Sequence, residues 1–294
     1  MGLPPTLPPA ETWLRLVELA FDEDIGPGDA TTALVIEPSR EGDAIIEARQ
    51  SLVVCGLEVA AEVFHQLDPD VEFHPRVRDG DRAEAGDLLA EVGGNLRAVL
   101  AGERTALNFM MRMCGVATLT RRFVDAVEGT GARIVDTRKT LPGWRTLDKY
   151  ATAVGGAVNH RLGLFDGILL KDNHIALAGG LELAVKAATA TAPDNLRVQI
   201  EVESEEDAVA AVEAGIDFLL LDNRETEEIR RIVERLRGRA LLEASGGVTL
   251  ENVRAIAETG VQRISIGALT HSAAGVDVAM EIDLGAEISG GARA

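Results

Sequence analysis

Several features that mark particular protein classes are scarce or missing in this 294-residue chain. Two cysteines, Cys55 and Cys114, supply neither a disulfide framework nor the spacing of a metal site. Both lie in apolar stretches, so we expect buried thiols. No apolar run is long enough to span a bilayer, and the first residues lack the basic and apolar regions of a signal peptide. We therefore expect a cytoplasmic protein without a membrane partner.

Aromatic residues and positive charge are also scarce. Aromatics make up 3% of the chain against 46% for all hydrophobic residues, which favours an α/β protein packed from small aliphatic side chains. The 29 Lys and Arg residues are outnumbered by 48 Asp and Glu residues, and the formal net charge is -19. This charge argues against nucleic acid or an anionic membrane surface as a partner.

The few positive charges gather in one segment. Residues 104–171 hold 11 Lys and Arg but 5 Asp and Glu, so this segment carries +6 while the rest of the chain carries -25. Such a basic island in an acidic chain suggests a pocket for an anionic small molecule. A basic helix face would give the same charge pattern, and charge alone does not separate the two interpretations.

The hydrophobic pattern divides the chain into two regions. Residues 1–110 combine amphipathic helices with strands joined by Asp-Gly turns, which predicts a small N-terminal α+β domain. Residues 111–274 contain six short apolar runs that alternate with helical segments ending in Gly, a pattern typical of a parallel sheet. We predict a C-terminal (β/α) barrel there, open or incomplete, with residues 275–294 packing on the N-terminal domain. No GxGxxG motif follows a strand, so a dinucleotide fingerprint is absent.

A long helical pattern covers residues 95–129. Leu100, Arg104, Leu107 and Met111 share one face of this predicted helix, which places Arg104 in an apolar stripe. A cation there is costly unless it meets an anion. Its partner could be an internal carboxylate such as Glu103, or a ligand or a second subunit.

Polar residues follow each predicted strand of the barrel, where active sites of such barrels form. Arg and Lys at these ends suit carboxylates or pyrophosphate, and two histidines, His160 and His174, lie among them. Glu201 and Asp222 suit Mg²⁺ or ribose hydroxyls, although both could be structural carboxylates at helix N-termini. The cations at these ends are Arg138, Lys139, Arg161 and Lys171.

The last two strand ends predict a phosphate site. "SGGVTLENV" and "SIGALTHS" each place glycine where a helix is expected to begin, and backbone N–H groups at a helix start bind phosphate. In (β/α) barrels this site typically uses the last two strand loops. The candidate residues are Ser245, Gly246, Gly247, Ser265, Gly267, Ala268 and His271.

Taken together, these motifs resemble one known family. "DTRKTLPGWRTLDKYA", "GGAVNHRLGLFDGILLKDNHI", "LLLDN" and "LEASGGVTLENV" are similar to segments of the quinolinate phosphoribosyltransferases, and the resemblance covers almost the whole chain in order. Ala157 departs from it, because the family often has a third Gly there. The resemblance implies that quinolinate and phosphoribosyl pyrophosphate react, with Mg²⁺, to give nicotinate mononucleotide, pyrophosphate and CO₂ in NAD biosynthesis.

The resemblance also implies roles for the site residues. Lys139, Lys171, Glu201 and Asp222 would be catalytic, and Glu201 and Asp222 would hold the metal directly or indirectly. Arg104 would reach the site from a neighbouring subunit of a homodimer or hexamer with shared active sites. The residues implied to bind the substrates are Arg104, Thr137, Arg138, Lys139, His160, Arg161 and Lys171. The phosphate candidates named above would hold the 5′-phosphate.

Three other interpretations remain open. A homologue of the same superfamily associated with molybdenum uptake would share the barrel, and activity with quinolinate against nicotinate would distinguish it. A Schiff-base lyase using Lys171 would be trapped by borohydride with a carbonyl substrate. A non-catalytic phosphate-binding protein would need no carboxylate set beside its phosphate site.

Overall fold

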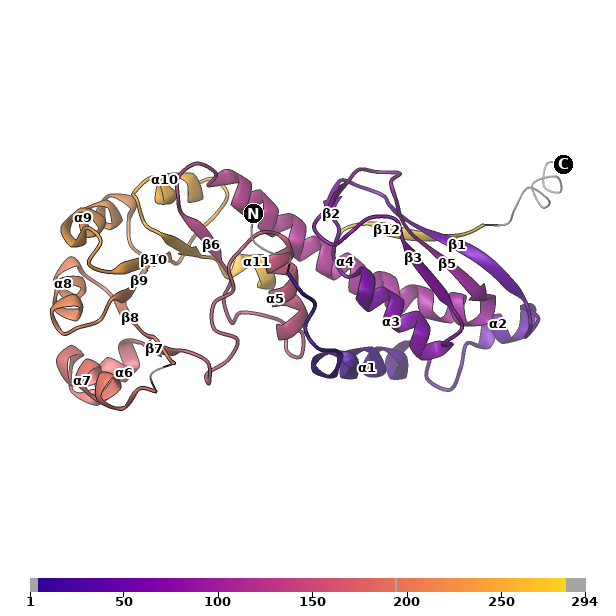
Figure 1. Cartoon of the computed structure of the whole chain (residues 1–294), viewed down its shortest axis with the longest axis horizontal. Helices are drawn as coiled ribbons and strands as arrows, with labels where there is room; N and C mark the ends of the chain where they lie inside the picture. The colour runs from indigo at the N-terminus through magenta and orange to yellow at the C-terminus, as the bar shows by residue number, and fades with distance from the viewer. Residues whose placement is uncertain (1–4, 194, 284–294) are drawn as a thin grey trace. The chain divides into compact units, whose positions relative to one another are not determined.

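The computed structural model describes residues 5–193 and 195–283, which form two compact units (Figure 1). Unit 1 comprises Met1–Leu119, Leu141–Gly155 and Ala273–Ala294, and unit 2 comprises Thr120–Thr140 and Gly156–Ser272. The expected boundary at residue 110 falls inside helix α4 (Leu96–Ala126), which runs from unit 1 into unit 2. Helix α5 (Arg145–Val154), which the sequence pattern placed in the barrel region, belongs to unit 1.

Unit 1 is built on a four-stranded antiparallel sheet with the strand order β12-β1-β5-β3. Strand β12 (Val278–Asp283) pairs with β1 (Glu41–Ala48), and the rest of the predicted C-terminal segment, residues 284–294, lies outside the described residues. Strands β2 and β4 form a separate antiparallel pair. The other elements of unit 1 are η1 (Ala10–Thr12), α1 (Leu14–Asp24), α2 (Ala30–Val35), β2 (Leu52–Val53), α3 (Leu57–Leu67), β3 (Glu72–Pro75), β4 (Arg82–Ala83) and β5 (Leu88–Asn95).

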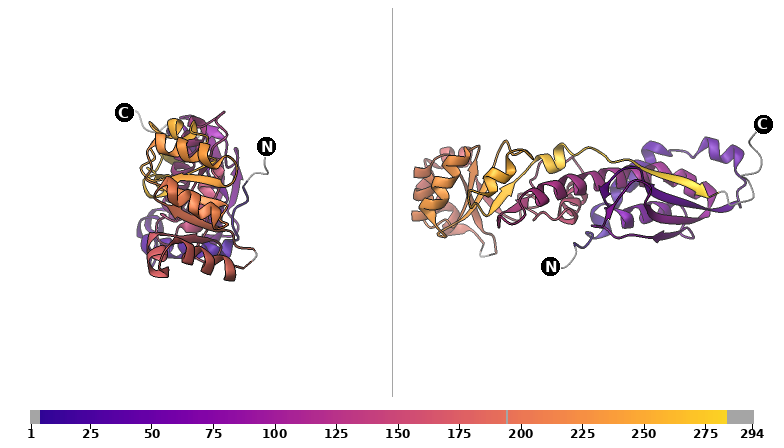
Figure 2. Two further views of the ribbon diagram at one scale, coloured as in Figure 1. Left: turned by 90° about the vertical axis from the view of Figure 1, so that its left-hand side faces the viewer. Right: turned by 90° about the horizontal axis from the view of Figure 1, so that it is seen from above.

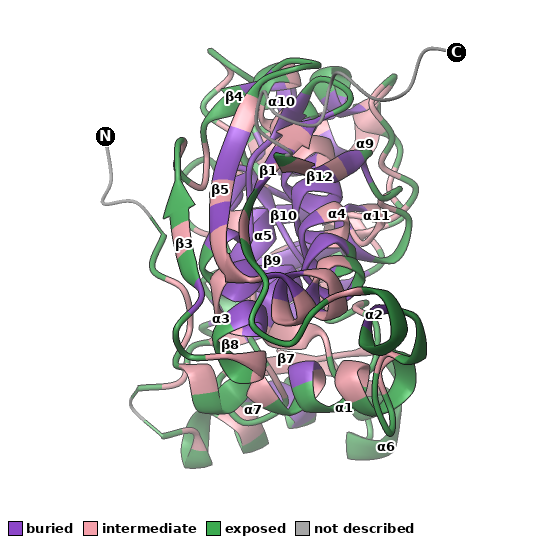
Figure 3. Ribbon diagram, turned by 90° about the vertical axis from the view of Figure 1, so that its right-hand side faces the viewer, coloured by how far each residue is buried: buried purple, intermediate pink, exposed green. Residues whose placement is uncertain are grey.

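One face of this sheet is buried, and buried residues also gather along α4 (Figure 3). In β1 every second residue, Ala44, Ile46 and Ala48, is buried, as the period of a strand requires. Cys55 and Cys114 are both buried, as predicted, and burial raises the pKa of Cys114 to about 12. A thiol with so high a pKa is unreactive at neutral pH.

Helix α4 spans 31 residues, which confirms the long helical pattern. No helix in residues 5–193 and 195–283 is both long enough and apolar enough to cross a membrane.

Unit 2 is the predicted open barrel. Its six strands are all parallel in the order β6-β11-β10-β9-β8-β7, and within this unit the two end strands, β6 and β7, are not paired with each other. A single bridge between Val135 and Val158 adds a short extended segment to the free edge of β6. The strands are β6 (Arg133–Val135), β7 (Ile168–Leu170), β8 (Val198–Val202), β9 (Phe218–Asp222), β10 (Leu241–Ser245) and β11 (Arg263–Ser265).

Helices connect successive strands and cover the outer side of the curved sheet (Figures 1 and 2). Local sequence explains where they begin and end. For example, Ser204 accepts a hydrogen bond from the Asp207 N–H at the start of α8, and Gly215 follows its end at φ 97°. The helices that connect the strands from β7 to β11 are α6 (Asp172–Ala178), α7 (Leu181–Thr191), α8 (Glu205–Glu213), α9 (Thr226–Leu236) and α10 (Val253–Ala257), and α11 (Ala268–His271) follows β11.

Candidate active site

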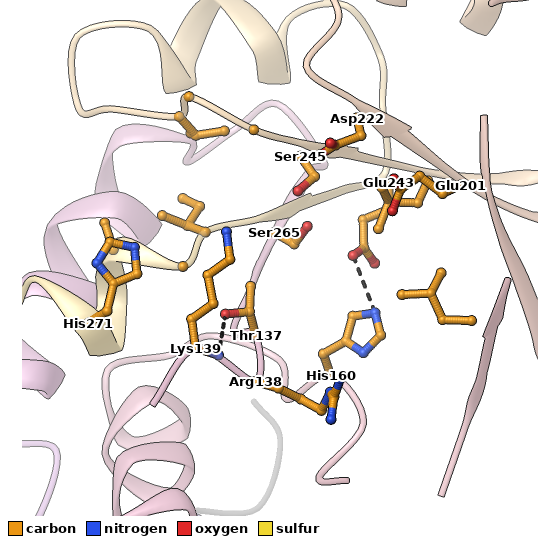
Figure 4. Close-up of a pocket in the computed structure, with 18 of the residues that line it drawn as sticks. Thr137, Arg138, Lys139, His160, Glu201, Asp222, Glu243, Ser245, Ser265 and His271 are labelled. Carbon is orange, nitrogen blue, oxygen red and sulfur yellow. Dashed lines mark hydrogen bonds and ion pairs between the residues drawn. The ribbon is translucent and has the colours of Figure 1, made fainter. Parts of the chain in front are cut away.

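A cavity of about 460 Å³ lies in unit 2, lined by residues at the carboxyl ends of its strands (Figure 4). All of the predicted site residues except Arg104 and His174 line it. The sequence pattern therefore predicted the wall of this cavity correctly, because parallel strands bring their carboxyl ends to one edge. Glu243 also lines the cavity, and the sequence had placed it at the end of its strand as either a site carboxylate or a structural one. The lining residues that were not predicted are Leu169, Leu220, Val248, Thr249 and Ile266.

Two arginines meet on one side of the cavity. The Arg161 Nη1 donates to the carbonyl of Gly167 at 3.0 Å, which holds its side chain in place. Burial, and next the charge of Arg138, lower the pKa of Arg161 below its ordinary value. Bringing two guanidinium groups together costs electrostatic energy, which a bound anion would recover. This side of the cavity is therefore suited to a carboxylate or a phosphate.

His160 lies beside these arginines with both ring nitrogens near protein groups. Nδ1 accepts a hydrogen bond from the Arg161 N–H at 2.7 Å, whereas Nε2 lies 3.0 Å from the Gln199 Oε1 and 3.5 Å from the Glu243 carboxylate (Figure 4). These contacts with Arg161, Gln199 and Glu243 fix the orientation of the imidazole ring. His174 does not line the cavity, contrary to expectation, because its Nδ1 accepts the Lys171 N–H at the start of α6.

Three carboxylates face the cations. Glu201 pairs with Lys171, with Oε2 at 2.5 Å from Nζ, and Asp222 accepts a hydrogen bond from the Asn223 side chain at 2.7 Å. Glu243 is fully buried and accepts from Arg263 at 2.7 Å, but its Oε1 has no hydrogen bond. Among the described residues no group of three or more His, Cys, Asp or Glu side chains could hold a metal ion by itself.

The glycine-rich loop after β10 has a backbone that only glycine suits. Gly246 has φ 90°, and a Cβ there would lie 2.1 Å from the Asn223 Oδ1. The expected helix start is wrong for this loop, because α10 begins at Val253 rather than after Gly247. The backbone N–H groups that would bind phosphate here would therefore have to belong to the turn itself, as they do in backbone nests that bind anions.

The Lys139 side chain extends across the cavity toward a second glycine-containing loop, which follows β11 and includes Gly267. A Cβ on Gly267 would lie 2.8 Å from the Lys139 Cδ and 3.2 Å from the His271 ring, so the absence of a side chain at Gly267 makes room for both. The Thr270 hydroxyl also donates to the Lys139 carbonyl at 2.7 Å. Lys139 extends toward the side that carries Ser245 and Ser265 (Figure 4). This end of the cavity therefore combines a cation with glycine loops, as a phosphate site requires.

Comparison with known proteins decides the family. The family model described as "Quinolinate phosphoribosyl transferase, C-terminal domain" matches residues 116–281, and the corresponding N-terminal domain model matches residues 29–114. The chain belongs to the quinolinate phosphoribosyltransferase family.

Relatives and solved structures agree with this membership. A Bacillus subtilis (strain 168) protein named "Probable nicotinate-nucleotide pyrophosphorylase [carboxylating]" is 39% identical over 274 residues, 93% of this chain and 94% of that protein. The Nicotiana tabacum mitochondrial quinolinate phosphoribosyltransferase [decarboxylating] 2b is 39% identical over 299 residues, covering 94% and 84%. The structure of the nicotinate-nucleotide pyrophosphorylase from Francisella tularensis superposes with a TM-score of 0.91 at 36% identity, covering 96% of this chain and 100% of that one.

In this member of the family, Arg104 is not buried in an apolar face as its position on α4 suggested. Its side chain is 55% exposed in the single chain, and Nη2 lies 4.0 Å from the Glu103 carboxylate. The exposure removes the expected cost of burying a cation within one subunit, and at 4.0 Å the contact with Glu103 is weak.

Asp136 is a positioning residue that sequence reasoning missed. It is fully buried at the end of β6, directly before the Thr137–Lys139 loop. Its Oδ1 accepts the His160 N–H at 2.7 Å and its Oδ2 accepts from the Asn159 side chain, also at 2.7 Å. The carboxylate thus joins the two segments that carry Arg138 and Arg161. The abrupt end of an apolar run at Asp136 was the available signal, but its partners lie 23 and 24 residues away.

We expect Asp136→Ala to raise the KM for quinolinate about tenfold, because the loss of two buried hydrogen bonds, about 1–3 kcal/mol, lets the arginine-bearing segments separate. The KM for phosphoribosyl pyrophosphate should change less than about twofold, since the hydrogen bonds that are lost join Asp136 to Asn159 and His160 rather than to the glycine loops. Steady-state kinetics with each substrate varied in turn would measure both. Asn159→Ala should give a weaker form of the same pattern. As a control, exposed Asp217→Ala should change neither KM, and an equal rise of both KM values for Asp136→Ala would show general damage.

Proposed function

We propose that this protein transfers the phosphoribosyl group of phosphoribosyl pyrophosphate to quinolinate, with decarboxylation, to give nicotinate mononucleotide, pyrophosphate and CO₂. The observation that carries the proposal is that one cavity holds two separate anion-binding ends. Arg138 and Arg161 meet at one end, and Lys139 with the glycine loops forms the other. A pyridine dicarboxylate and a sugar phosphate would occupy these ends together.

We assign the binding roles from the family resemblance and the positions of the side chains. Arg138, His160 and Arg161 would hold the pyridine dicarboxylate, and Lys139, whose N–H donates to the Thr137 hydroxyl at 3.1 Å, would reach from this group toward the glycine loops. Lys171 lies near the ribose and the departing pyrophosphate. The residues assigned to the 5′-phosphate are Ser245, Gly246, Gly247, Ser265, Gly267, Ala268 and His271.

The chemistry needs charge stabilisation rather than a covalent protein intermediate. The bond between the ribose C1′ and the pyrophosphate oxygen breaks, and the electron pair leaves with pyrophosphate. Glu201 and Asp222 stabilise the positive ribosyl centre that develops. The pyridine nitrogen then bonds to C1′ and becomes cationic. The bond from C2 to its carboxyl group breaks, CO₂ departs, and the electron pair remaining on C2, stabilised by the adjacent N⁺, takes a proton from solvent.

Magnesium fits the carboxylates of the cavity as an ion that arrives with the pyrophosphate substrate. Mg²⁺ is usually bound by one or two carboxylates together with substrate phosphates and waters. Glu201 and Asp222 would hold it directly or through water. When bound, the ion would neutralise the charge of the leaving pyrophosphate.

The assembly and location that we propose are a cytoplasmic homodimer, or a hexamer, with shared active sites. The exposed Arg104 outside the cavity supports sharing, because the partner's Arg104 could then supply a further cation to quinolinate. The names of several plant relatives include the word mitochondrial or chloroplastic, so members of the family differ in their location in the cell.

One assay tests the reaction. The purified protein should release labelled CO₂ from quinolinate labelled in its 2-carboxyl group only when phosphoribosyl pyrophosphate and Mg²⁺ are present, and nicotinate mononucleotide should form in equal amount. Nicotinate in place of quinolinate should give no product, since it lacks the second carboxylate that the arginine end binds. Equal turnover of nicotinate, or borohydride trapping of Lys171 by a carbonyl substrate, would contradict the proposal.

A further inference from the structure

Lys171 and Glu201 neutralise each other in the cavity before any substrate is bound. Lys171 follows the end of β7 and Glu201 lies in β8, the neighbouring strand, so the sheet register fixes them side by side. The Lys171 Nζ lies 2.5 Å from the Glu201 Oε2, and both residues line the cavity. The Glu201 side chain is 11% exposed and that of Lys171 45%, so the carboxylate is the more firmly held partner.

We propose that this ion pair couples the binding of the two substrates. Glu201 occupies Lys171 and opposes the negative charge of quinolinate while the phosphoribosyl site is empty. Phosphoribosyl pyrophosphate binds the Glu201 carboxylate through its ribose hydroxyls and draws it from Lys171. Lys171 then becomes available to the substrate anions. The inference rests on the proposed function, and it adds that each substrate increases the affinity for the other.

The other carboxylates of the cavity are not paired with a lysine. Asp222 accepts a hydrogen bond from the neighbouring Asn223 side chain, and the buried Glu243 is paired with Arg263 and lies 3.5 Å from the His160 Nε2. The Lys139 side chain lies beside Gly267, and the Lys139 backbone carbonyl accepts from the Thr270 hydroxyl. The Lys171–Glu201 pair therefore joins a cation assigned to substrate anions with a carboxylate assigned to the ribose.

Thermodynamic linkage gives the sign of the coupling. A carboxylate within a few ångströms of a bound dianion weakens its binding, and removing that charge strengthens it. If phosphoribosyl pyrophosphate moves the same carboxylate away from Lys171, quinolinate must bind more tightly in its presence, and the reverse must also hold by the same factor. Because Lys171 is partly exposed, we expect a coupling factor of about five to ten.

Calorimetric binding of quinolinate alone, without phosphoribosyl pyrophosphate or metal, tests the first consequence. Glu201→Gln keeps the shape of the side chain but removes its charge, and it should bind quinolinate about five- to tenfold more tightly than the natural protein. Asp222→Asn is the matched control, because it removes one negative charge from the same cavity without touching Lys171. It should change the affinity by less than about twofold. Unchanged or weaker binding by Glu201→Gln would overturn the inference.

Coupling in the natural protein can be measured with benzene-1,2-dicarboxylate, which has two adjacent carboxylates but no ring nitrogen and so cannot react. Saturating phosphoribosyl pyrophosphate should tighten its binding about five- to tenfold in the natural protein, but not in Glu201→Gln. Equal coupling in both proteins, or none in the natural protein, would overturn the inference while leaving the proposed reaction intact. Failure of the natural protein to bind quinolinate at all would overturn the proposed function itself.

Discussion

Arg161→Ala should lower kcat/KM for quinolinate by about a hundred- to a thousandfold, since two charge-assisted hydrogen bonds to a carboxylate contribute about 3–4 kcal/mol. Arg161 is fixed by its bond to Gly167 and lies near enough to Arg138 for repulsion to lower its pKa, so alanine removes a cation already placed for an anion. Affinity for phosphoribosyl pyrophosphate should change by less than about threefold, because its phosphate end lies on other loops. Steady-state kinetics and calorimetry with each substrate would measure the two effects.

Two further variants sharpen this test. Arg161→Lys keeps the positive charge but not the planar fork, and it should recover only about tenfold of the lost activity. Arg231→Ala removes an exposed arginine of helix α9 and should leave both substrates unaffected. Normal turnover of quinolinate by Arg161→Ala would show that the dicarboxylate binds elsewhere in the cavity.

The barrel and most of its cavity could be predicted because they follow from local patterns. Six apolar runs of strand length became six parallel strands, and the polar residues after them came together at one edge. This inference needs no knowledge of which strands are neighbours, since every carboxyl end of a parallel sheet reaches the same side.

The remaining parts depend on contacts between distant residues, which a local pattern does not contain. The expected domain bounds put residues 145–154 in the barrel region, whereas helix α5 belongs to unit 1. A single carboxylate at Asp136 looked like any strand end, although its two hydrogen bonds reach Asn159 and His160. Arg104 lay on a face with apolar neighbours, and yet its long side chain is exposed. In each case the local sequence indicated the kind of residue or element, but it did not identify what that residue or element contacts.

Unit 1 contains a buried ion pair whose disruption should have the largest effect on stability. The Arg112 Nη2 donates to both carboxylate oxygens of Asp148 at 3.0 Å, and the two side chains are 16% and 1% exposed. Arg112→Met should lower the free energy of unfolding by about 3–5 kcal/mol, because it leaves an uncompensated buried carboxylate. Both tryptophans, Trp13 and Trp144, lie in unit 1, so fluorescence-monitored urea unfolding reports on this unit.

The pH dependence and a double variant separate this cause from a general loss of packing. Burial raises the pKa of Asp148 even though Arg112 opposes the shift, and Arg112→Met should raise the pKa further. A carboxyl group whose pKa is higher in the folded than in the unfolded state favours folding at pH values below its unfolded-state pKa. This contribution is lost as pH rises through the folded-state pKa, so the variant should be closest to normal stability in acid. Adding Asp148→Leu should restore most of the loss at neutral pH, since the carboxylate that Arg112→Met leaves unpaired is then removed. If the double variant were as unstable as Arg112→Met alone, lost packing rather than the unpaired charge would account for the effect.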